Sequence, residues 1–325
     1  MELIGLSTNF FTLVEDRIQL VEARMRDHVE EHHPDLRAVL DHLISSGGKR
    51  IRPVVALLTG QMLGADSDRL ITLAASIEML HTASLVHDDL IDGSLLRRGI
   101  PTLNAKWSPA ATVLAGDYIF ARAAELASQT DSVAVMQIFA KTLATIVNGE
   151  VTQLFNSRGV ANRDDYYRRI YAKTASMFVL ATRAAAILSQ VDDRVIDGVH
   201  QYGYEVGMAF QIVDDILDFT GEQATVGKPV ASDLRQGLVT LPALYYQEAN
   251  PDDPDMQAVL SGEYHNGERI IRLVKSIRAS GAIDQAHVEA KAYVARGLQA
   301  LNGISKGEEY LGLMEIGSYI VDRKI

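Results

Sequence analysis

The stretch Ser84-Leu85-Val86-His87-Asp88-Asp89-Leu90-Ile91-Asp92-Gly93 places three carboxylates inside a strongly apolar run. Residues four apart share a face of an α-helix, so Asp88 and Asp92 point the same way and Asp89 lies to one side. Carboxylates in apolar surroundings are costly unless a cation or a hydrogen-bond donor compensates them. Two of them one turn apart form a half-site for a hard divalent cation, which prefers oxygen ligands.

A second copy of this pattern follows much later in the chain. Residues 211–219 read Gln-Ile-Val-Asp-Asp-Ile-Leu-Asp-Phe, so Asp214, Asp215 and Asp218 repeat the spacing among apolar neighbours. A single Asp-Asp-x-x-Asp can arise by chance at an exposed helix end. Two copies in apolar helices indicate one cavity of a helical bundle on which both sets of carboxylates converge.

The bulk composition excludes several classes of function. The chain has 325 residues, a net charge of −11 and 47% hydrophobic residues, and it contains no cysteine. The acidity disfavours nucleic-acid binding, although solubility alone accounts for it, and the lack of cysteine excludes thiolate metal sites. We find no signal-peptide pattern and no unbroken apolar run of about 18 residues. We therefore expect a cytoplasmic protein without a transmembrane segment.

Helical periodicity covers nearly the whole chain. It predicts long helices at 9–31, 66–91, 108–130, 131–157, 162–189 and 192–219, separated by glycine- or proline-containing breaks. No stretch alternates for long enough to demand a sheet. We therefore expect an all-α fold and a single domain over residues 1–325.

Cations recur beside the acidic motifs. They occur in Gly47-Gly48-Lys49-Arg50-Ile51-Arg52-Pro53, in Arg97-Arg98-Gly99, in Lys173-Thr174 and in Gly227-Lys228-Pro229. Surplus cations around a metal imply a bound polyanion, most simply a diphosphate. No serine or cysteine nucleophile is apparent, so the simplest chemistry is removal of a diphosphate leaving group by charge neutralisation. The stabilised carbocation left behind points to prenyl chemistry.

The chain resembles the trans-isoprenyl diphosphate synthases, the polyprenyl synthetase family. The shared motifs occur in family order between residues 47 and 229. They are Gly-Gly-Lys-x-x-Arg, His-Asp-Asp-x-x-Asp with Arg-Arg-Gly, Lys-Thr, Phe-Gln-x-x-Asp-Asp-x-x-Asp, and Gly-Lys-Pro. The resemblance implies one large helical bundle around a deep central cavity, usually as a homodimer.

The resemblance also implies the residues of the site. Three Mg²⁺ ions would be bound by Asp88, Asp92 and Asp214. Asp89 and Asp218 would support these ligands. The allylic diphosphate would be held by three cations: Arg97, Lys173 and Lys228. Isopentenyl diphosphate would be held without metal by four residues: Lys49, Arg52, His81 and Arg98. Thr174 and Gln211 would position the substrates, so catalysis would depend on Lys173, Thr174, Gln211, Asp88 and Asp214.

The implied reaction joins isopentenyl diphosphate to an allylic diphosphate of the geranyl, farnesyl or geranylgeranyl type. Ionisation, attack by the double bond and loss of a proton, with the departing diphosphate as acceptor, would give a longer all-trans chain. The product is a lipid that could associate with a membrane. One position departs from the family pattern, because Leu238 stands where many members carry a lysine. We expect weaker allylic binding or a differently closed lid there.

Small residues precede the first aspartate motif. In the family, aromatic side chains one turn before this motif shorten the product, whereas here Ala83 and Ser84 are small, and Leu80 in the next layer is not aromatic. This favours a long product of six or more isoprene units. The other interpretation is that small residues there let helices pack closely, with the tunnel floor set elsewhere.

Other functions remain open at this point. A geranylgeranyl or farnesyl diphosphate synthase shares all the motifs, and a class I terpene cyclase shares the bundle and the first motif. A non-catalytic subunit of a heteromeric synthase would tend to lose aspartates that this chain keeps. His87-Asp88 also invites a His-Asp phosphohydrolase, but the further paired histidines of such a site are missing.

Overall fold

The computed structural model describes residues 10–27, 33–45, 48–97, 99–156, 162–221, 230–304 and 306–323. The chain forms two compact units. The first unit comprises Met1–Lys141, Met177–Gly203 and Ala300–Ile316, and the second comprises Thr142–Ser176, Tyr204–Gln299 and Gly317–Ile325. Helices α7 (Val133–Asn156), α10 (Asp193–Thr220) and α17 (Glu308–Asp322) supply residues to both units.

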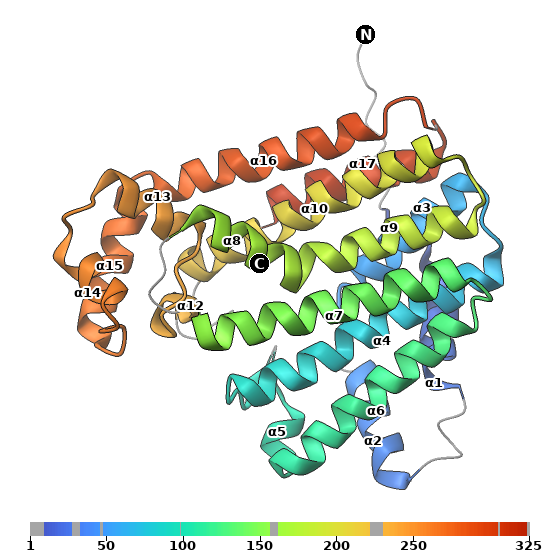
Figure 1. Ribbon diagram of the computed structural model, residues 1–325, viewed down its shortest axis with the longest axis horizontal. Helices are drawn as coiled ribbons and strands as arrows, with labels where there is room; N and C mark the ends of the chain where they lie inside the picture. The colour runs from blue at the N-terminus through green and yellow to red at the C-terminus, as the bar shows by residue number, and fades with distance from the viewer. Residues whose placement is uncertain are drawn as a thin grey trace. The chain divides into compact units, whose positions relative to one another are not determined.

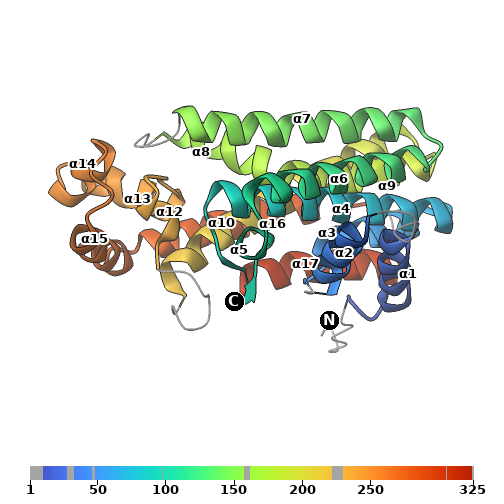
Figure 2. The same cartoon turned by 90° about the horizontal axis from the view of Figure 1, so that it is seen from below.

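The first unit is built on α4 (Figure 1). Its other helices are α1 (Glu15–Arg26), α2 (Pro34–Ser45), α3 (Ile51–Leu63), α5 (Leu103–Lys106), α6 (Pro109–Ser128) and nearly all of α9 (Ser176–Leu188). The second unit, whose α13, α14 and α15 are separately visible in Figure 2, consists mainly of short helices. They are α8 (Arg163–Ile170), the π-helix η2 (Tyr171–Ala175), α12 (Ser232–Arg235), α13 (Leu241–Ala249), α14 (Pro254–Leu260) and α15 (Gly267–Ala279). The longer α16 (Ala282–Ala300) also belongs to this unit, except for its last residue.

Helix α4 (Ser67–Ile91) is the central helix of the first unit and carries the first aspartate motif at its end. The Asp66 side chain caps its start by accepting a hydrogen bond from the Arg69 N–H at 3.0 Å, which satisfies one otherwise unpaired donor. Ser76 Oγ donates to the Ala123 carbonyl of α6 at 2.8 Å. Such close contact holds the two helices together and fixes the direction in which the motif points.

Among the described residues, α4 is the one helix long and apolar enough to cross a membrane by length and composition. However, 83% of its most apolar window is buried inside the protein, as expected of a core helix. The sequence showed no unbroken apolar run of that length because polar residues interrupt this one.

The predicted helices agree with the structure to within a few residues, with three differences. The predicted helix 162–189 is divided into α8, the π-helix η2 and α9. The first helix begins only at Glu15, after a turn over residues 10–14. A two-stranded antiparallel hairpin, β1 (Leu96–Arg97) with β2 (Ile100–Pro101), follows the first motif. Gly99 allows the tight turn because its φ of +76° is rarely adopted by other residues. The hairpin matters for the site because it carries Arg97.

Candidate active site

The first aspartate motif combines a buried carboxylate with two that are more exposed. Asp89 is 6% exposed, Asp88 is half-buried, and Asp92 is exposed as the residue that ends α4. Arg97 of β1 binds Asp89, with Nε 3.0 and 2.9 Å from its two carboxylate oxygens and Nη2 2.9 Å from Oδ1. Arg97, which was predicted to hold a diphosphate, therefore neutralises the buried aspartate of the motif in this structure.

Two of the predicted isopentenyl diphosphate residues, Arg52 at the start of α3 and His81 of α4, lie in contact. Arg52 Nη1 lies 3.1 Å from His81 Nε2 of α4, and its guanidinium lies 5.3 Å from the ring centre of Phe178. Lys49 is exposed just before the helix. Neither an imidazole nor a phenyl ring supplies negative charge, so these two contacts orient Arg52 without neutralising it. Gly47 and Arg98, the other predicted parts of this group, lie outside the described residues.

His87 has a packing role in the first unit. Its Nε2 lies 3.2 Å from the Val113 carbonyl and 3.7 Å from Asp117 Oδ1, and its ring lies 5.4 Å from that of Phe120. A side chain on Gly116 would collide with this imidazole, so the glycine makes room for it. These contacts orient His87 toward α6. No group of three or more His, Asp or Glu side chains in the described ranges is already arranged to hold a metal ion.

The residues predicted to set product length are buried. Leu80 and Ala83 are completely buried, and Ser84 Oγ donates to the His81 carbonyl at 2.8 Å. Helical spacing puts Leu80 and Ala83 on the face of α4 that carries Ser76 toward α6. Ser84 lies closer to the face of Asp88. The proposed tunnel along these residues stays a prediction, and the structure adds that the Ala83 side faces α6.

The second aspartate motif lies on α10 and contacts the end of the chain. Arg323 Nη2 lies 2.7 Å from Asp214 Oδ1, donates to the Phe210 carbonyl at 2.6 Å, and stacks 3.9 Å from the Phe210 ring centre. Its side chain is 5% exposed, whereas that of Asp214 is 40% exposed. Sequence reasoning missed Arg323, because no motif surrounds it and it follows Asp214 by more than a hundred residues.

Asp215 is buried and held by neutral donors. Tyr166 OH donates to Oδ2 at 2.7 Å, and Gln211 Nε2 donates to Oδ1 at 2.9 Å. Burial, together with the charge of Asp233, raises the pKa of Asp215 to about 8. Gln211 Oε1 in turn accepts from Thr174 Oγ1 at 2.5 Å. This chain of hydrogen bonds fixes the orientation of the Gln211 amide and joins two residues predicted to position substrate.

Asp218 is used to hold α12. Its carboxylate accepts hydrogen bonds from Ser232 N at 3.0 Å, Ser232 Oγ at 2.9 Å and Asp233 N at 3.2 Å. Its backbone carbonyl accepts from the Ala231 N–H at 2.9 Å. Asp218 therefore positions the segment that follows the predicted Gly-Lys-Pro loop. Lys228 of that loop lies outside the described residues, and Leu238, beyond α12, is buried.

Lys173 lies in the π-helix η2. π-Helical turns are rare and often mark functional sites, because the extra residue per turn re-aims a side chain. Lys173 Nζ lies 3.0 Å from Glu150 Oε1 of α7, and a side chain on Gly149 would collide with Ala172. Gly149 thus lets α7 approach η2 closely enough for the ion pair. Glu150 was not predicted, although the Gly149-Glu150 pair in an apolar helix was a usable signal.

Comparison with known proteins places this arrangement in a family. The polyprenyl synthetase family model matches residues 33–277. Heptaprenyl diphosphate synthase component 2 of Bacillus subtilis is 35% identical over 315 residues, covering 97% of this chain and 90% of the relative. Octaprenyl diphosphate synthase of Escherichia coli is 34% identical over 281 residues, covering 85% of this chain and 87% of the relative.

A solved structure agrees over the whole length. The polyprenyl synthase of Caulobacter crescentus, crystallised in complex with calcium and isoprenyl diphosphate, superposes with a TM-score of 0.91 at 33% identity, covering 100% of both chains. The all-α fold is therefore that of this family. The chain belongs to the polyprenyl synthetase family, and it is a prenyltransferase.

Proposed function

We propose that the protein condenses isopentenyl diphosphate with an allylic diphosphate, of geranyl, farnesyl or geranylgeranyl type, into a longer all-trans polyprenyl diphosphate. The observation that carries the proposal is the similarity, over nearly the whole chain, to synthases named for products of seven and eight isoprene units. The half-exposed aspartates Asp88 and Asp214 and the oriented cations Arg52 and Lys173 give that reaction its chemical basis.

In the proposed reaction, both aspartate motifs would act on the diphosphate of the allylic substrate. Asp88, Asp92 and Asp214 fit a divalent cation, because all three offer carboxylate oxygens and each is at least partly exposed. Mg²⁺, proposed at three ions per site, would supply the positive charge that stabilises the departing diphosphate. The calcium in the Caulobacter complex supports a divalent cation. Asp89 and Asp218 would support these metal ligands without binding the metal directly.

On the allylic side, Lys173 and Arg97 would hold the diphosphate, with Lys228 completing the set. Each of the two described cations is ion-paired with a carboxylate, Lys173 with Glu150 and Arg97 with Asp89, and these contacts orient them. Thr174 and the oriented Gln211 would line the position of the reacting carbons. On the other side, Lys49, Arg52, His81 and Arg98 would bind isopentenyl diphosphate through direct contacts, since no metal is proposed there.

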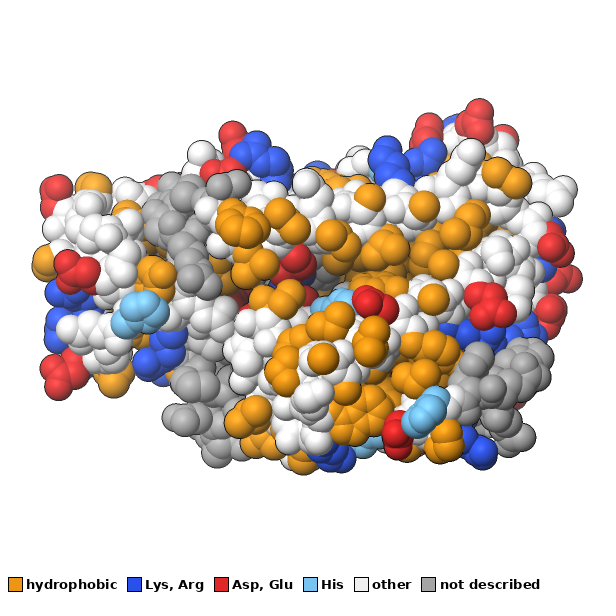
Figure 3. Space-filling view, turned by 60° about the horizontal axis from the view of Figure 1, so that its bottom comes forward, with side chains coloured by type: hydrophobic (Ala, Val, Ile, Leu, Met, Phe, Trp, Pro, Cys, Tyr) orange, Lys and Arg blue, Asp and Glu red, His pale blue; other side chains and the backbone are white. Residues whose placement is uncertain are grey.

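We also propose a homodimer. On α7, Val147, Val151, Leu154 and Phe155 follow helical spacing, and their exposed fractions lie between 42% and 79%. Figure 3 shows hydrophobic side chains gathering on one face of the molecule. An apolar stripe of this kind is typical of a face covered by a partner, and a second copy of the chain is the simplest occupant. A cytoplasmic location is part of the same proposal.

The function is tested by incubating the purified protein with radiolabelled isopentenyl diphosphate, farnesyl diphosphate and Mg²⁺. Label in a prenyl product of six or more units, read by chromatography after dephosphorylation, is the expected result. Label that stops at four units would indicate a geranylgeranyl diphosphate synthase. A cyclic hydrocarbon would indicate a terpene cyclase, and no reaction without a second protein would indicate a subunit of a heteromeric enzyme.

A further inference from the structure

The stretch 48–52 at the start of α3 carries three cations, and one of them is largely buried. Lys49 is exposed and Arg52 contacts His81, but the side chain of Arg50 is only 9% exposed. Neither the motif nor the proposed function gives Arg50 a role. A buried arginine of this kind needs a specific set of partners.

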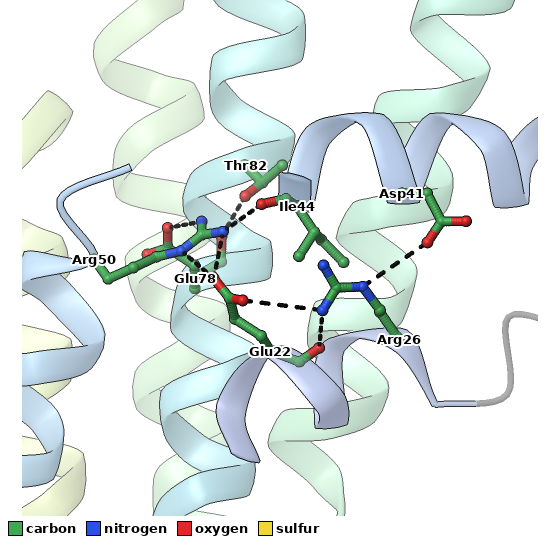
Figure 4. A network of polar contacts seen from close by, with 7 residues as sticks. All are labelled: Glu22, Arg26, Asp41, Ile44, Arg50, Glu78 and Thr82. Atoms are coloured by element: carbon green, nitrogen blue, oxygen red, sulfur yellow. Dashed lines mark hydrogen bonds and ion pairs between the residues drawn. The ribbon is translucent and has the colours of Figure 1, made fainter. Parts of the chain in front are cut away.

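Arg50 binds three helices of the first unit (Figure 4). Nη1 donates to Glu78 Oε1 of α4 at 2.7 Å, and Nε donates to Glu22 Oε1 of α1 at 3.1 Å. Nη2 donates to the Ile44 carbonyl in the last turn of α2 at 2.8 Å. All three nitrogens of the guanidinium are therefore used. Burial opposes the charge, but the carboxylates of Glu78 and Glu22 more than offset it and raise the pKa of Arg50.

The backbone of Arg50 has an unusual conformation. It precedes α3 with φ +45° and ψ +29°, in the left-handed region that side-chain-bearing residues rarely adopt. Such a conformation persists only when the surroundings enforce it, and it often occurs at functional sites. The ion pairs of Arg50 with Glu78 and Glu22 are the contacts that would enforce it here. The turn directly determines the direction in which the Lys49 side chain points and the way in which α3 begins.

Arg50 and Arg52 contact neighbouring positions on α4. Arg50 binds Glu78, and Arg52 binds His81 three residues later, on adjacent turns of the same helix. Displacing Arg50 from Glu78 would therefore shift Arg52 relative to His81. Glu78 is 5% exposed, so its carboxylate has little freedom to follow a displaced partner.

We infer that Arg50 is a positioning residue for isopentenyl diphosphate: its ion pairs with Glu78 and Glu22 hold the left-handed turn that aims Lys49 and Arg52 at the diphosphate. The inference rests on the proposed function, because it names what the pairs position. By this inference, the contact of Arg50 with α1 and α4 contributes to substrate binding. Lys49 and Arg52 would contact the diphosphate, and Arg50 would hold them in position.

A double variant separates positioning from stability. Replacing both members of a buried ion pair by apolar residues of similar size is often neutral for stability, whereas removing one member leaves an uncompensated charge. Arg50→Met/Glu78→Leu should therefore stay folded. It should raise the KM for isopentenyl diphosphate at least tenfold, while kcat and the KM for farnesyl diphosphate change less than about threefold. Glu78→Gln, which keeps the shape, should show a smaller rise in the same KM.

The matched control is Arg26→Ala. Arg26 belongs to the same cluster, through Asp41 at 3.8 Å and Glu22 at 4.0 Å, but it contacts no residue of the 48–52 turn. It should leave the KM for isopentenyl diphosphate unchanged. Circular dichroism and the melting temperature check folding, and calorimetric binding of isopentenyl diphosphate alone checks affinity without turnover.

Two results would overturn the inference separately from the proposed function. A folded double variant, or the Glu78→Gln variant if the double variant does not fold, with unchanged KM and binding would leave Arg50 only a structural role. An equal rise for both substrates would also overturn it, since that indicates general loosening of the site. Failure of the wild-type protein to bind isopentenyl diphosphate or extend a primer would instead overturn the proposed function.

Discussion

The two aspartate motifs have the same spacing but different surroundings. In the first, the buried Asp89 is neutralised by a cation, Arg97. In the second, the equivalent Asp215 is held by neutral donors from Tyr166 and Gln211, and its pKa is raised instead. The middle aspartate of each motif is thus a structural group, and the two motifs compensate its burial by different means.

The last aspartate of each motif differs even more. Asp92 is exposed at the end of α4, whereas Asp218 accepts three hydrogen bonds from Ser232 and Asp233. We therefore propose that Asp88 and Asp92 of the first motif bind metal, and mainly Asp214 of the second. Spacing in the sequence determines where carboxylates lie, but their neighbours determine how many can bind metal. This fits the proposal of two ions at the first motif and one at the second.

The largest effect is expected from the proposed metal ligands of the first motif. Asp88→Asn and Asp92→Asn should each lower kcat by about 10²–10³-fold, because charge stabilisation at a leaving group is worth that much. Steady-state assays at saturating substrates measure the loss. Asp218→Asn is the matched variant, and it should lose less activity than Asp92→Asn. Equal losses for these two would contradict the difference drawn between the motifs.

Ala83→Phe tests the chain-length prediction beside the first motif. A phenyl group there should block the growing tail, so the products become shorter while transfer to a short primer continues. Chromatography of the dephosphorylated products measures the change. Ser84→Phe, one residue on and closer to the face of Asp88, should act in the same direction. Unchanged product length in both variants would rule out a tunnel along this part of α4.

Asp215 should make the stability of the metal-free protein depend on pH. Its carboxyl pKa is raised from 3.8 to about 8, so between these values the folded state holds a proton that the unfolded chain has released. The free energy of unfolding should therefore decrease as pH rises from about 4 to about 8. Denaturant titrations in a chelator would show this, and Asp215→Asn should flatten the decrease. An unaltered slope in the variant would exclude Asp215 as its source.

Asp218→Asn should reduce stability as well as activity. An asparagine keeps one acceptor oxygen but loses the charge that faces the first turn of α12, so unfolding should become easier by about 1 kcal/mol. Urea titration compares this variant with Asp92→Asn. Because Asp92 is exposed at the end of α4, its substitution should change stability by less. Stability losses of the same size in both would indicate that α12 does not depend on Asp218.

The smallest effect is expected from Arg323. Because the Arg323 guanidinium is ion-paired with Asp214, Arg323 should compete with a metal ion for that carboxylate. Arg323→Ala should therefore lower the Mg²⁺ concentration needed for half-maximal activity by about threefold, in the range of a single ion pair. A metal titration of initial rates measures it. A higher Mg²⁺ requirement would mean that Arg323 supports the ligand rather than competing with it.

The sequence was sufficient for the helical architecture and for locating the motifs, because helix periodicity and fixed spacings are local properties. It could not show which member of each motif is buried. Arg97, Tyr166 and Ser232 contact the motif carboxylates only in the folded chain. Arg323 and Glu150 were missed for the same reason, as their partners lie far away in the chain. The π-helix at Lys173 was also missed, because its Tyr-Ala-Lys-Thr-Ala sequence is compatible with an ordinary α-helix.

The central claim is that both aspartate motifs act on one diphosphate, and a crystal structure with Mg²⁺ and an unreactive thiolo analogue of farnesyl diphosphate tests it most directly. We predict metal ions on Asp88 and Asp92 and a further ion on Asp214, all sharing oxygen atoms of the same diphosphate. Metal at only one motif, or a diphosphate contacted by only one of them, would contradict the account.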